Sequence, residues 1–468
     1  MCAVAIFFCE LLTLGILLLS GYNAMKRDIY SKLLLWKESE RRKPLVLKGA
    51  RQTGKTYILK ELGRKEYKDV FYFNFEEDAG LDLFFQKNMD PQRIIRELSI
   101  YSKRDITPEK DLIIFDEIQA SNNALNSLKY IHEQANEYHV AAAGSLLGIK
   151  FSSPKSFPVG KVNFLNLFPL SFPEFLSAAG EERYRNFLES VAAIEPLPVP
   201  FHDELISLLR SYYFTGGMPE AVRCFTETGN LTEVRTIHKE IINSYLLDFA
   251  KHASSTDIPK LSHIWNSIPS QLARENKKFM FSAVRKTARA RDYENAIVWL
   301  EDAGLIHRAF AASTARHPLQ GYVNQNIFKV YALDIGLLGA MVDISAEILV
   351  RGDRFFNEYQ GAFVENYVAQ HLAAMFEKPL VYWKSEGKMA EVDFLLETED
   401  TILPLEVKAG INPKSKSLSS YDIQFQPPLL CRSTLLNLKF DGRILNIPLY
   451  AISNLKYLVQ VARSVRNP

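Results

Sequence analysis

The sequence predicts an α/β fold built on a parallel β-sheet, and three observations predict it. A glycine-rich loop joins a short apolar strand to a helix within residues 44–62. Strand-like and helix-like segments then alternate as far as about residue 170, which is typical of a parallel sheet covered by helices on both faces. A second apolar strand ends in two adjacent acids, Asp116 and Glu117. Because ligands bind at the carboxyl ends of such strands, the loop and the acids are expected at one site.

The glycine-rich loop reads Gly49-Ala50-Arg51-Gln52-Thr53-Gly54-Lys55-Thr56 and matches the phosphate-binding motif G-x-x-x-x-G-K-[ST]. A strand-like run precedes it and a helical run follows it, which is the context the motif requires because a helix N-terminus carries partial positive charge. The glycines let the backbone wrap a phosphate, the lysine adds a point charge and the threonine hydroxyl binds Mg²⁺. The residues expected to bind ATP are Gly49, Gln52, Thr53, Gly54, Lys55, Thr56 and Asp116, and those expected to hold Mg²⁺ are Thr56 and Asp116.

The acids and a serine end the neighbouring strands. Asp116 is expected to hold Mg²⁺ directly or through water, and Glu117 to orient or deprotonate the attacking water. Ser145 follows the next strand and is expected to sense the γ-phosphate or to position water, although serine at a strand end also serves turns. The catalytic residues expected are Glu117, Lys55 and Ser145. The strands expected besides the first are Val70–Phe75, Leu112–Phe115, Tyr138–Ala143 and Val162–Phe168.

Length and composition are those of a soluble globular protein with several domains. The chain has 468 residues, which predicts two to four domains, and its 47% hydrophobic and 24% charged residues are ordinary. A net charge of +2 gives no overall electrostatic bias, so a surface for nucleic acid must be local. The four cysteines form no C-x-x-C pair, so neither a zinc site nor a disulfide framework is indicated and a reducing cytoplasm is expected.

Residues 1–24 differ from the rest of the chain, because Ala3–Ser20 is almost wholly apolar. Three interpretations compete. A signal peptide would need a basic start, yet no Lys or Arg precedes Lys26. A membrane anchor suits a length of about 18 residues, but Glu10 near its centre is costly. The third is a start codon placed too early, with Met25 as the true start; we favour it, and expect a cytoplasmic protein with no stable membrane partner.

The middle of the chain is expected to be helical and then to form a winged helix-turn-helix. The proline-rich run Ala193–Pro200 marks a boundary or a long loop. Apolar residues at helical spacing over 203–250 predict a helical lid, or else a plain helical spacer. Within 258–310, three helical segments precede a wing-like strand that begins at Leu305.

The segment 271–291 is locally basic. It holds one acid, Glu275, against seven Lys or Arg residues, which is the footprint of a DNA contact. The alternatives are a solvated charged face and a winged helix used for protein interaction. The seven residues are Arg274, Lys277, Lys278, Arg285, Lys286, Arg289 and Arg291.

A second group of acids lies between residues 361 and 408. A helical segment carries Glu365, one strand expected at residues 391–396 carries Asp393, and a second at residues 404–408 carries Glu406 and Lys408 on one face. Carboxylates around a divalent ion with a lysine beside them are what metal-dependent phosphodiester cleavage needs. The pattern resembles the restriction-endonuclease-like superfamily, in which an acid is followed by Glu-x-Lys on adjacent strands. Such folds also persist as inactive binding modules, so cleavage itself is left open.

The motifs together resemble AAA+-type ATPases, in the wider group whose extra strand lies between the phosphate loop and the acidic strand. More narrowly, the chain is similar to prokaryotic ATPases that carry a C-terminal domain of uncharacterised function. The resemblance covers nearly everything from Met25 onward. The motifs that carry the resemblance are the glycine-rich loop, Asp116-Glu117-Ile118-Gln119, Gly144-Ser145, Phe168-Pro169-Leu170-Ser171-Phe172-Pro173-Glu174-Phe175 and Gly216-Gly217-Met218-Pro219-Glu220.

One departure from that family concerns the arginine that acts on a neighbour's phosphate. The family usually has Gly-Arg before the last strand of the sheet, whereas here Lys161 follows Gly160. Lysine keeps the charge but lacks the planar guanidinium fork. The role is therefore left unassigned, and a homo-oligomer is expected if a neighbour must supply it. The alternatives are Arg183, Arg210 and Arg223.

The resemblance implies a P-loop NTPase sheet followed by a helical lid, a winged helix and a small α/β restriction-endonuclease-like domain. The first function expected is that of a Mg²⁺-dependent ATPase acting on DNA or a protein–DNA complex. The alternatives are an ATP-regulated nuclease and a non-hydrolysing, nucleotide-switched binding module. The domains expected are 1–24 (the apolar segment, outside the true protein under the late start), 25–195 (ATPase core), 196–255 (lid), 256–345 (winged helix) and 346–468 (restriction-endonuclease-like).

Overall fold

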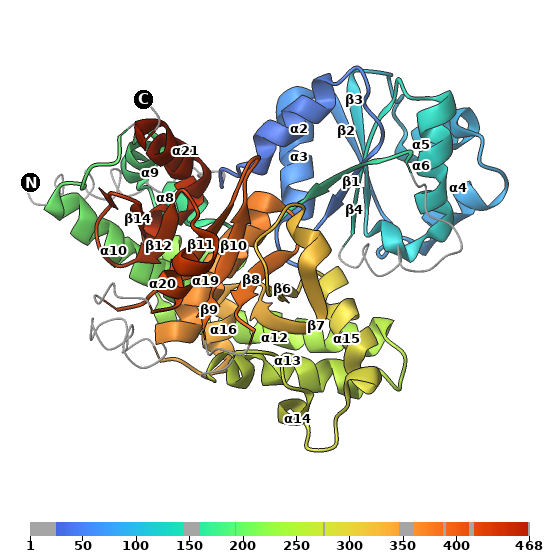
Figure 1. Ribbon diagram of the computed structural model, residues 1–468. Coiled ribbons are helices and arrows are strands. Elements are labelled where there is room, and N and C mark those ends of the chain that lie inside the picture. The colour runs from blue at the N-terminus through green and yellow to red at the C-terminus, as the bar shows by residue number, and fades with distance from the viewer. Residues whose placement is uncertain are drawn as a thin grey trace, which may run out of the picture.

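The computed structural model describes residues 25–144, 160–191, 193–274, 277–345, 360–386, 390–410 and 416–466. The predictions made for residues 1–24 and for Ser145 lie outside these residues. Three β-sheets and the helices around them make up the described molecule (Figure 1). None of the helices in the described ranges is long and apolar enough to cross a membrane.

The first sheet confirms the predicted α/β class. Its five strands are all parallel and run in the order β2-β3-β4-β1-β5, so that β4 is the extra strand between the phosphate loop and the acidic strand. The strands are β1 (Leu45–Lys48), β2 (Asp69–Asn74), β3 (Asp111–Asp116), β4 (His139–Gly144) and β5 (Asn163–Asn166). The helices around them are α2 (Ile29–Glu38), α3 (Lys55–Glu66), α4 (Leu83–Gln86), α5 (Pro91–Ser102) and α6 (Asn122–Gln134).

Helices cover both faces of this sheet because its strands are apolar on both sides. Leu45 and Leu47 of β1 face α2 and α3 in one buried cluster, whereas Val46 faces α5 and α6 in the other. Figure 1 shows the two pairs of helices on opposite sides of the strands. Successive strand residues alternate between the two faces, and this placement brings the loop after β1 to the same edge of the sheet as the end of β3.

Helices follow the sheet, as the sequence predicts for the middle of the chain. The turn between α10 and α11 packs directly against the chain that follows β5. A Cβ at Gly217 would lie 2.1 Å from the carbonyl oxygen of Leu170. Only glycine fits there. These helices are α8 (Phe172–Ala178), α9 (Glu182–Glu189), α10 (Val199–Thr215), α11 (Pro219–Thr228) and α12 (Leu231–His252).

The middle segment, which we define as residues 258–341, has three helices followed by an antiparallel hairpin, the order the sequence predicts for a winged helix. The backbone N–H of Phe279 donates to Phe328 O over 2.8 Å, so the chain before α14 lies along the hairpin. The elements are α13 (Ile258–Leu272), α14 (Phe281–Val284), α15 (Ala290–Asp302), β6 (Ile306–Ala312), β7 (Val323–Ala332) and α16 (Ile335–Met341).

The C-terminal segment, residues 360–466, forms a five-stranded mixed sheet in the order β10-β11-β12-β14-β13 and adds two strands to the hairpin of the middle segment, in the order β7-β6-β8-β9. Residues 309–312 of β6 pair in parallel with residues 380–383 of β8. One sheet therefore spans both segments. The elements are α19 (Gln360–Phe376), β8 (Leu380–Lys384), β9 (Glu391–Val392), β10 (Phe394–Glu397), β11 (Ile402–Val407), α20 (Lys416–Phe425), β12 (Leu430–Thr434), β13 (Lys439–Asp441), β14 (Ile444–Pro448) and α21 (Leu455–Arg466).

The single strand predicted at residues 391–396 is wrong in one respect, because it is split at Asp393. Residues 391–392 pair with β8, and residues 394–397 pair with β11 in the other sheet. At the break, the Asp393 carboxylate accepts the N–H of Val407 over 2.8 Å. The alternating pattern of the sequence continues through the break and so could not reveal it.

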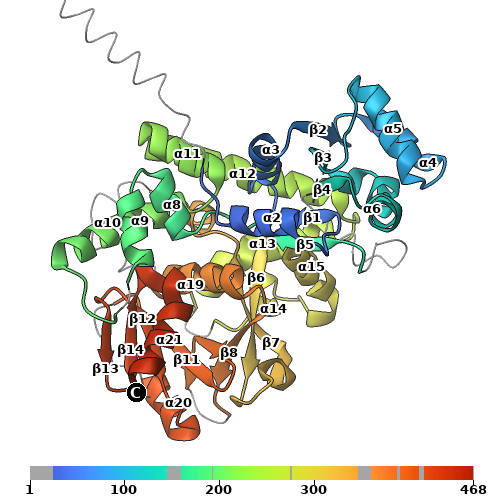
Figure 2. The same cartoon turned by 90° about the horizontal axis from the view of Figure 1, so that it is seen from above.

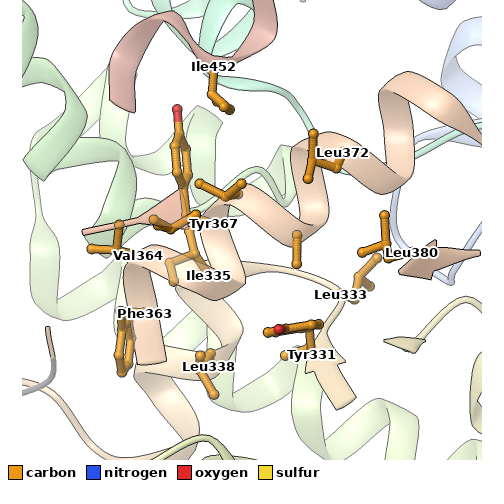
Figure 3. Packing of buried hydrophobic residues seen from close by; sticks show 14 of the residues in the cluster. Tyr331, Leu333, Ile335, Leu338, Phe363, Val364, Tyr367, Leu372, Leu380 and Ile452 are labelled. Atoms are coloured by element: carbon orange, nitrogen blue, oxygen red, sulfur yellow. The ribbon is translucent and has the colours of Figure 1, made fainter. Parts of the chain in front are cut away.

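Helix α19 lies at the centre of the largest apolar cluster. Figure 3 shows Phe363, Val364 and Tyr367 of α19 packed with side chains from α16, from β7 and from Ile452. Residues of the middle and C-terminal segments thus share one core. Figure 2 shows the first sheet (blue) and the C-terminal sheet (red) at opposite sides of the molecule, with the hairpin β6–β7 beside β8.

Candidate functional site

The glycine-rich loop turns tightly between β1 and α3. Gln52 and Gly54 have left-handed backbone conformations, with φ of 65° and 92°, and successive N–H groups in such turns form a concavity that suits anions. A Cβ at Gly49 would lie 2.3 Å from the carbonyl oxygen of Leu167, so only glycine lets the loop pass this close to the chain after β5. The loop therefore has the backbone form that phosphate binding requires.

Lys55 is a buried cation at the start of α3. Its ammonium donates to the carbonyl oxygens of Gly49, over 3.0 Å, and of Ala50, over 2.7 Å. Burial lowers the pKa of Lys55 to about 8, although the carboxylates of Glu117 and Asp116 act in the opposite direction. A phosphate anion would stabilise this charge, so the residue fits the triphosphate of ATP.

Thr56 and Asp116 are in direct contact, which unites the loop with the acidic strand end. The Thr56 hydroxyl donates to Asp116 Oδ2 over 2.6 Å. The same oxygen accepts from the Tyr72 hydroxyl over 2.9 Å, and Asp116 Oδ1 accepts the N–H of Glu117 over 3.0 Å. A hydroxyl and a carboxylate held side by side are the hard oxygen donors that Mg²⁺ prefers, so Thr56 and Asp116 fit a metal bound together with ATP.

Glu117 follows Asp116 in a left-handed conformation, with φ of 48°. Burial raises the pKa of its carboxyl, which Lys55 and a hydrogen bond from the Gln119 amide partly counteract. A carboxylate with a raised pKa is better suited to accept a proton. The third catalytic residue expected, Ser145, lies outside the described residues.

Sequence reasoning missed a contact between the loop and helix α12. The Arg51 guanidinium pairs with Asp248 and lies 3.7 Å from Glu76 Oε2. The Tyr245 hydroxyl of α12 donates to the backbone oxygen of Arg51 over 3.0 Å. On the other side, a Cβ at Gly304 would lie 3.5 Å from the Ala50 nitrogen. The loop is therefore held between α12 and the middle segment. Nothing in the spacing of these residues signals the contact.

The arginine that would act on a neighbour's phosphate stays unassigned. Lys161 pairs with Glu133 over 2.9 Å, within the same chain. Arg183 and Arg223 are exposed. Arg210 is partly buried.

The second group of predicted residues also comes together in space. We use the name carboxylate cluster for Glu365, Glu391, Asp393 and Glu406. Glu365 is 2% exposed and accepts hydrogen bonds from the Tyr331 hydroxyl, over 2.5 Å, and from Lys329, over 2.9 Å. It also pairs with Lys277. Burial alone would raise the pKa of Glu365, but Lys277 and Lys329 lower it to about 2.

The other members of the carboxylate cluster are engaged as well. Lys408 pairs with Glu406 Oε1 over 2.7 Å, as the shared strand face predicts. Burial, together with the neighbouring Glu365 and Glu406 carboxylates, raises the pKa of Asp393 to about 8. Across the described ranges, no group of three or more His, Cys, Asp or Glu side chains is arranged to hold a metal ion.

Lys329 is the cation beside the carboxylate cluster that sequence reasoning missed, together with Glu391 and Tyr331. It lies on β7, is fully buried, and pairs with Glu391 over 2.7 Å as well as with Glu365. Despite burial, these carboxylates raise its pKa well above the usual range. A lysine inside the apolar run 327–332 was the available signal, because lysine is rarely buried unless it is paired.

The basic segment is not one continuous surface, which corrects the prediction for Lys277. That side chain turns inward to Glu365 and is 18% exposed. By contrast, Arg274, Arg285, Lys286 and Arg289 are exposed. These exposed charges lie before α14 and in the turn between α14 and α15, and Arg291 at the start of α15 is exposed as well.

Comparison with protein families gives three matches along the chain. Residues 41–176 match a family described as an AAA domain. Residues 206–348 and residues 360–452 match two further families, each described as a domain of unknown function. A single family therefore covers most of the predicted lid together with the hairpin.

Curated and solved relatives are distant. An uncharacterized protein of Methanocaldococcus jannaschii is 26% identical over 228 residues, which are 48% of this chain and 43% of the relative, so the chain spans less than half of that protein's length. The Walker-type ATPase of Pyrococcus abyssi is 13% identical, with 68% of this chain and 96% of that chain covered and a TM-score of 0.44. The ORC1 protein of Aeropyrum pernix, solved in complex with DNA, is 13% identical, with 69% and 92% covered and a TM-score of 0.29.

The family follows from matches at both ends of the described molecule. The AAA-domain match contains the glycine-rich loop, Asp116 and Glu117, and the match at residues 360–452 contains Glu365, Asp393 and Glu406. The chain therefore belongs to the AAA+-type P-loop ATPases that carry C-terminal domains of uncharacterised function.

Proposed function

We propose that the protein binds and hydrolyses ATP with Mg²⁺ and acts on DNA or on a protein–DNA complex. The observation that carries the ATPase part is the 2.6 Å contact between the Thr56 hydroxyl and Asp116 Oδ2. It joins the phosphate loop to the acidic strand end, so that a metal ion and a nucleophilic water have their protein groups in one place. Bound Mg²⁺ would neutralise charge on the phosphates.

Each residue of the site has a distinct role in this proposal. Lys55 binds the outer phosphates, and Thr56 and Asp116 hold the metal. Glu117 orients the attacking water and takes its proton, for which its raised pKa suits it. Tyr72 fixes the Asp116 carboxylate through its hydroxyl. Arg51 transmits a change in the conformation of the loop to α12 through its ion pair with Asp248.

Two substitutions test the ATPase. Lys55→Ala should abolish ATP binding, because it removes the cation that faces the phosphates. Glu117→Gln should bind ATP with unchanged affinity and lower kcat by roughly 10²–10⁴-fold, the range attributed to general-base catalysis. Binding is measured by fluorescence titration with a labelled ATP analogue, and turnover by phosphate release.

Lys65→Ala is the matched control on the same helix, because Lys65 is 48% exposed and its ion pair is with Glu61 of its own helix. The proposal is wrong if Lys55→Ala and Glu117→Gln turn over ATP like the parent. Tight ATP binding by the parent without turnover would instead favour a nucleotide-switched binding module.

The DNA part rests on the exposed basic residues at the turn between α14 and α15. Arg285, Lys286 and Arg289 are exposed there, and the hairpin β6–β7 follows in the chain, which would be the wing if this segment is a winged helix. In an otherwise balanced chain, such a local group is suited to phosphate contacts. Steady-state ATPase rates with and without duplex DNA test whether the two activities are coupled.

A further inference from the structure

We propose that Lys329 occupies the position that a divalent cation would take in the carboxylate cluster, so that the cluster joins the middle segment to the C-terminal segment and does not cleave nucleic acid. The proposal does not depend on ATP turnover. It concerns the residues that the sequence pattern assigns to a metal-dependent nuclease, Glu365, Asp393, Glu406 and Lys408.

Lys329 contacts two carboxylates of the cluster and lies close to a third. Its ammonium lies 2.9 Å from Glu365 Oε1, 2.7 Å from Glu391 Oε1 and 3.9 Å from Asp393 Oδ1. The side chain is 1% exposed. A buried ammonium paired with the Glu365 and Glu391 carboxylates supplies the positive charge that a metal ion would otherwise supply, and a divalent ion placed beside it would be repelled.

The remaining oxygens of the cluster are also largely committed. Lys277 pairs with the second oxygen of Glu365, the Val407 N–H binds Asp393 Oδ2, and Lys408 pairs with Glu406 Oε1. Glu406 Oε2 is the buried oxygen of this group that has no hydrogen-bond partner among the described residues. Mg²⁺ demands near-octahedral oxygen coordination, so one oxygen beside an ammonium does not make a metal site.

The charges of the cluster come from two different segments. Lys277, Lys329 and Tyr331 belong to the middle segment, whereas the four carboxylates belong to the C-terminal segment. The cations therefore cross the same boundary that the β6–β8 ladder crosses. Removing one partner of such a buried pair leaves an uncompensated charge, which is strongly destabilising. The acids of the cluster thus hold the two segments together through these pairs.

The first experiment measures metal binding by the nucleotide-free, full-length protein. Mn²⁺ is titrated into the parent and into Glu406→Gln, and free Mn²⁺ is followed by electron paramagnetic resonance. The two proteins should bind the same amount of Mn²⁺, and neither should cut plasmid or single-stranded DNA in the presence of Mn²⁺. A Mn²⁺ site or a cleavage activity that the parent has and Glu406→Gln lacks would overturn the proposal.

The second experiment tests the ion pair between the two segments through a double-mutant cycle of Glu365→Gln and Lys329→Met. Each single variant should lower the melting temperature by several degrees, and the double variant should lose less than the sum of the two, because it removes both charges. Lys439→Met is the control, since its pair with Asp441 is exposed on both sides (61% and 71%). Additive losses would show that the two groups do not stabilise each other and would overturn the proposal. If Lys329→Met does not fold, the Mn²⁺ comparison still decides.

Discussion

Two buried lysines show how a single residue's surroundings determine what it can bind. Burial lowers the pKa of Lys55 to about 8, because its contacts are mainly carbonyl oxygens. Burial acts on Lys329 in the same direction, but the carboxylates around it raise its pKa well above the usual value. Lys55 can therefore gain from an anion such as a phosphate, whereas Lys329 already has its counter-ions. The chain thus contains one buried lysine that can still bind an anion and one whose charge is already balanced by neighbouring carboxylates.

His371 on α19 makes a contact with the chain that follows the first sheet, and we expect this contact to be sensitive to acid. Its Nε2 accepts the N–H of Phe172 over 3.2 Å and its Nδ1 lies 2.9 Å from Tyr367 O. Burial lowers its pKa to about 4, while Tyr367 O and Glu174 act in the opposite direction. The folded state thus binds fewer protons than the unfolded state between pH 4 and pH 6.5, and stability is lost as the pH falls through that window, by up to roughly 3 kcal/mol.

Thermal unfolding between pH 7 and pH 4.5 checks this prediction. His371→Gln removes the titrating ring and should flatten the dependence of the melting temperature on pH. His132→Gln, on the partly exposed face of α6, is the matched His→Gln control for the substitution itself. Equal slopes for the parent and His371→Gln would contradict the prediction. His238 and His307 are also buried, with pKa values lowered to about 3 and about 4, so a residual slope is expected.

At the residue level, the sequence pattern identified the parts of the candidate nucleotide site that are local in the chain, and the structure brings them together. The loop from Gly49 to Thr56 is one run of residues, and its partner Asp116 ends an apolar strand, so pattern alone placed both. Arg51 and Asp248 are 197 residues apart, and their pairing follows from how α12 packs. Lys277 was expected on a basic surface, because a count of charges does not tell which side chain turns inward to a buried acid.

At the scale of elements, Asp334 connects the turn after α10 to the start of α16. Its Oδ2 accepts the N–H of Gly217 over 2.6 Å, and its Oδ1 accepts the N–H of Leu337 over 3.0 Å as the N-cap of α16. Burial raises its pKa to about 6, against the effect of these hydrogen bonds. The geometry of both elements thus depends on one carboxyl group whose burial is itself unfavourable for its charged form.

Asp334→Ala should lower the free energy of unfolding by roughly 2–4 kcal/mol, because it leaves two buried N–H groups without an acceptor. Asp334→Asn should lose less, since its side-chain oxygen can still accept one of the two bonds. Urea denaturation followed by circular dichroism measures both. Asp441→Ala is the control, because that side chain is 71% exposed and the change should alter stability by less than about 0.5 kcal/mol. A loss for Asp334→Ala no greater than for this control would refute the assignment.

The boundaries of helices and strands could be predicted where the apolar periodicity is strong. They could not be predicted where the choice of the partner strand sets the end of a strand. Apolar residues at helical spacing predicted the helices over residues 203–250, and short apolar runs predicted the strands around β3. The sequence pattern also predicted one strand across Asp393, where the structure has two. That break arises because β9 pairs with β8 and β10 with β11, and the choice between partners depends on tertiary packing that period-2 patterning does not contain.

At the scale of the whole molecule, the phosphate loop is contacted from several directions. Helix α12 reaches it through Asp248 and Tyr245, and Arg27 near the described N-terminus donates to Thr53 O over 3.0 Å. The middle segment approaches Ala50 at Gly304. A change in the loop on binding ATP would therefore be felt by α12 and by the segment that carries the exposed basic residues.

Arg285→Glu combined with Lys286→Glu should weaken binding to duplex DNA and lower the salt dependence of the affinity. If each residue neutralises one phosphate, the slope of log K against log salt should fall by about 2, since each contact contributes about 0.9. Fluorescence anisotropy at several salt concentrations measures it. Lys439→Glu changes an exposed lysine on β13 and should bind DNA like the parent. An unchanged slope in the double variant would show that this turn does not contact DNA.

The sheet shared by the middle and C-terminal segments has a consequence for dissecting the protein. Residues 309–312 of β6 have their ladder partners on β8, and apolar side chains of α19 cover the same region. A fragment that stops at residue 345 would present β6 as a bare edge strand next to an uncovered apolar surface. Such edges recruit strands from other molecules, so we expect the shortened protein to form soluble oligomers or precipitate rather than to behave as an independent ATPase.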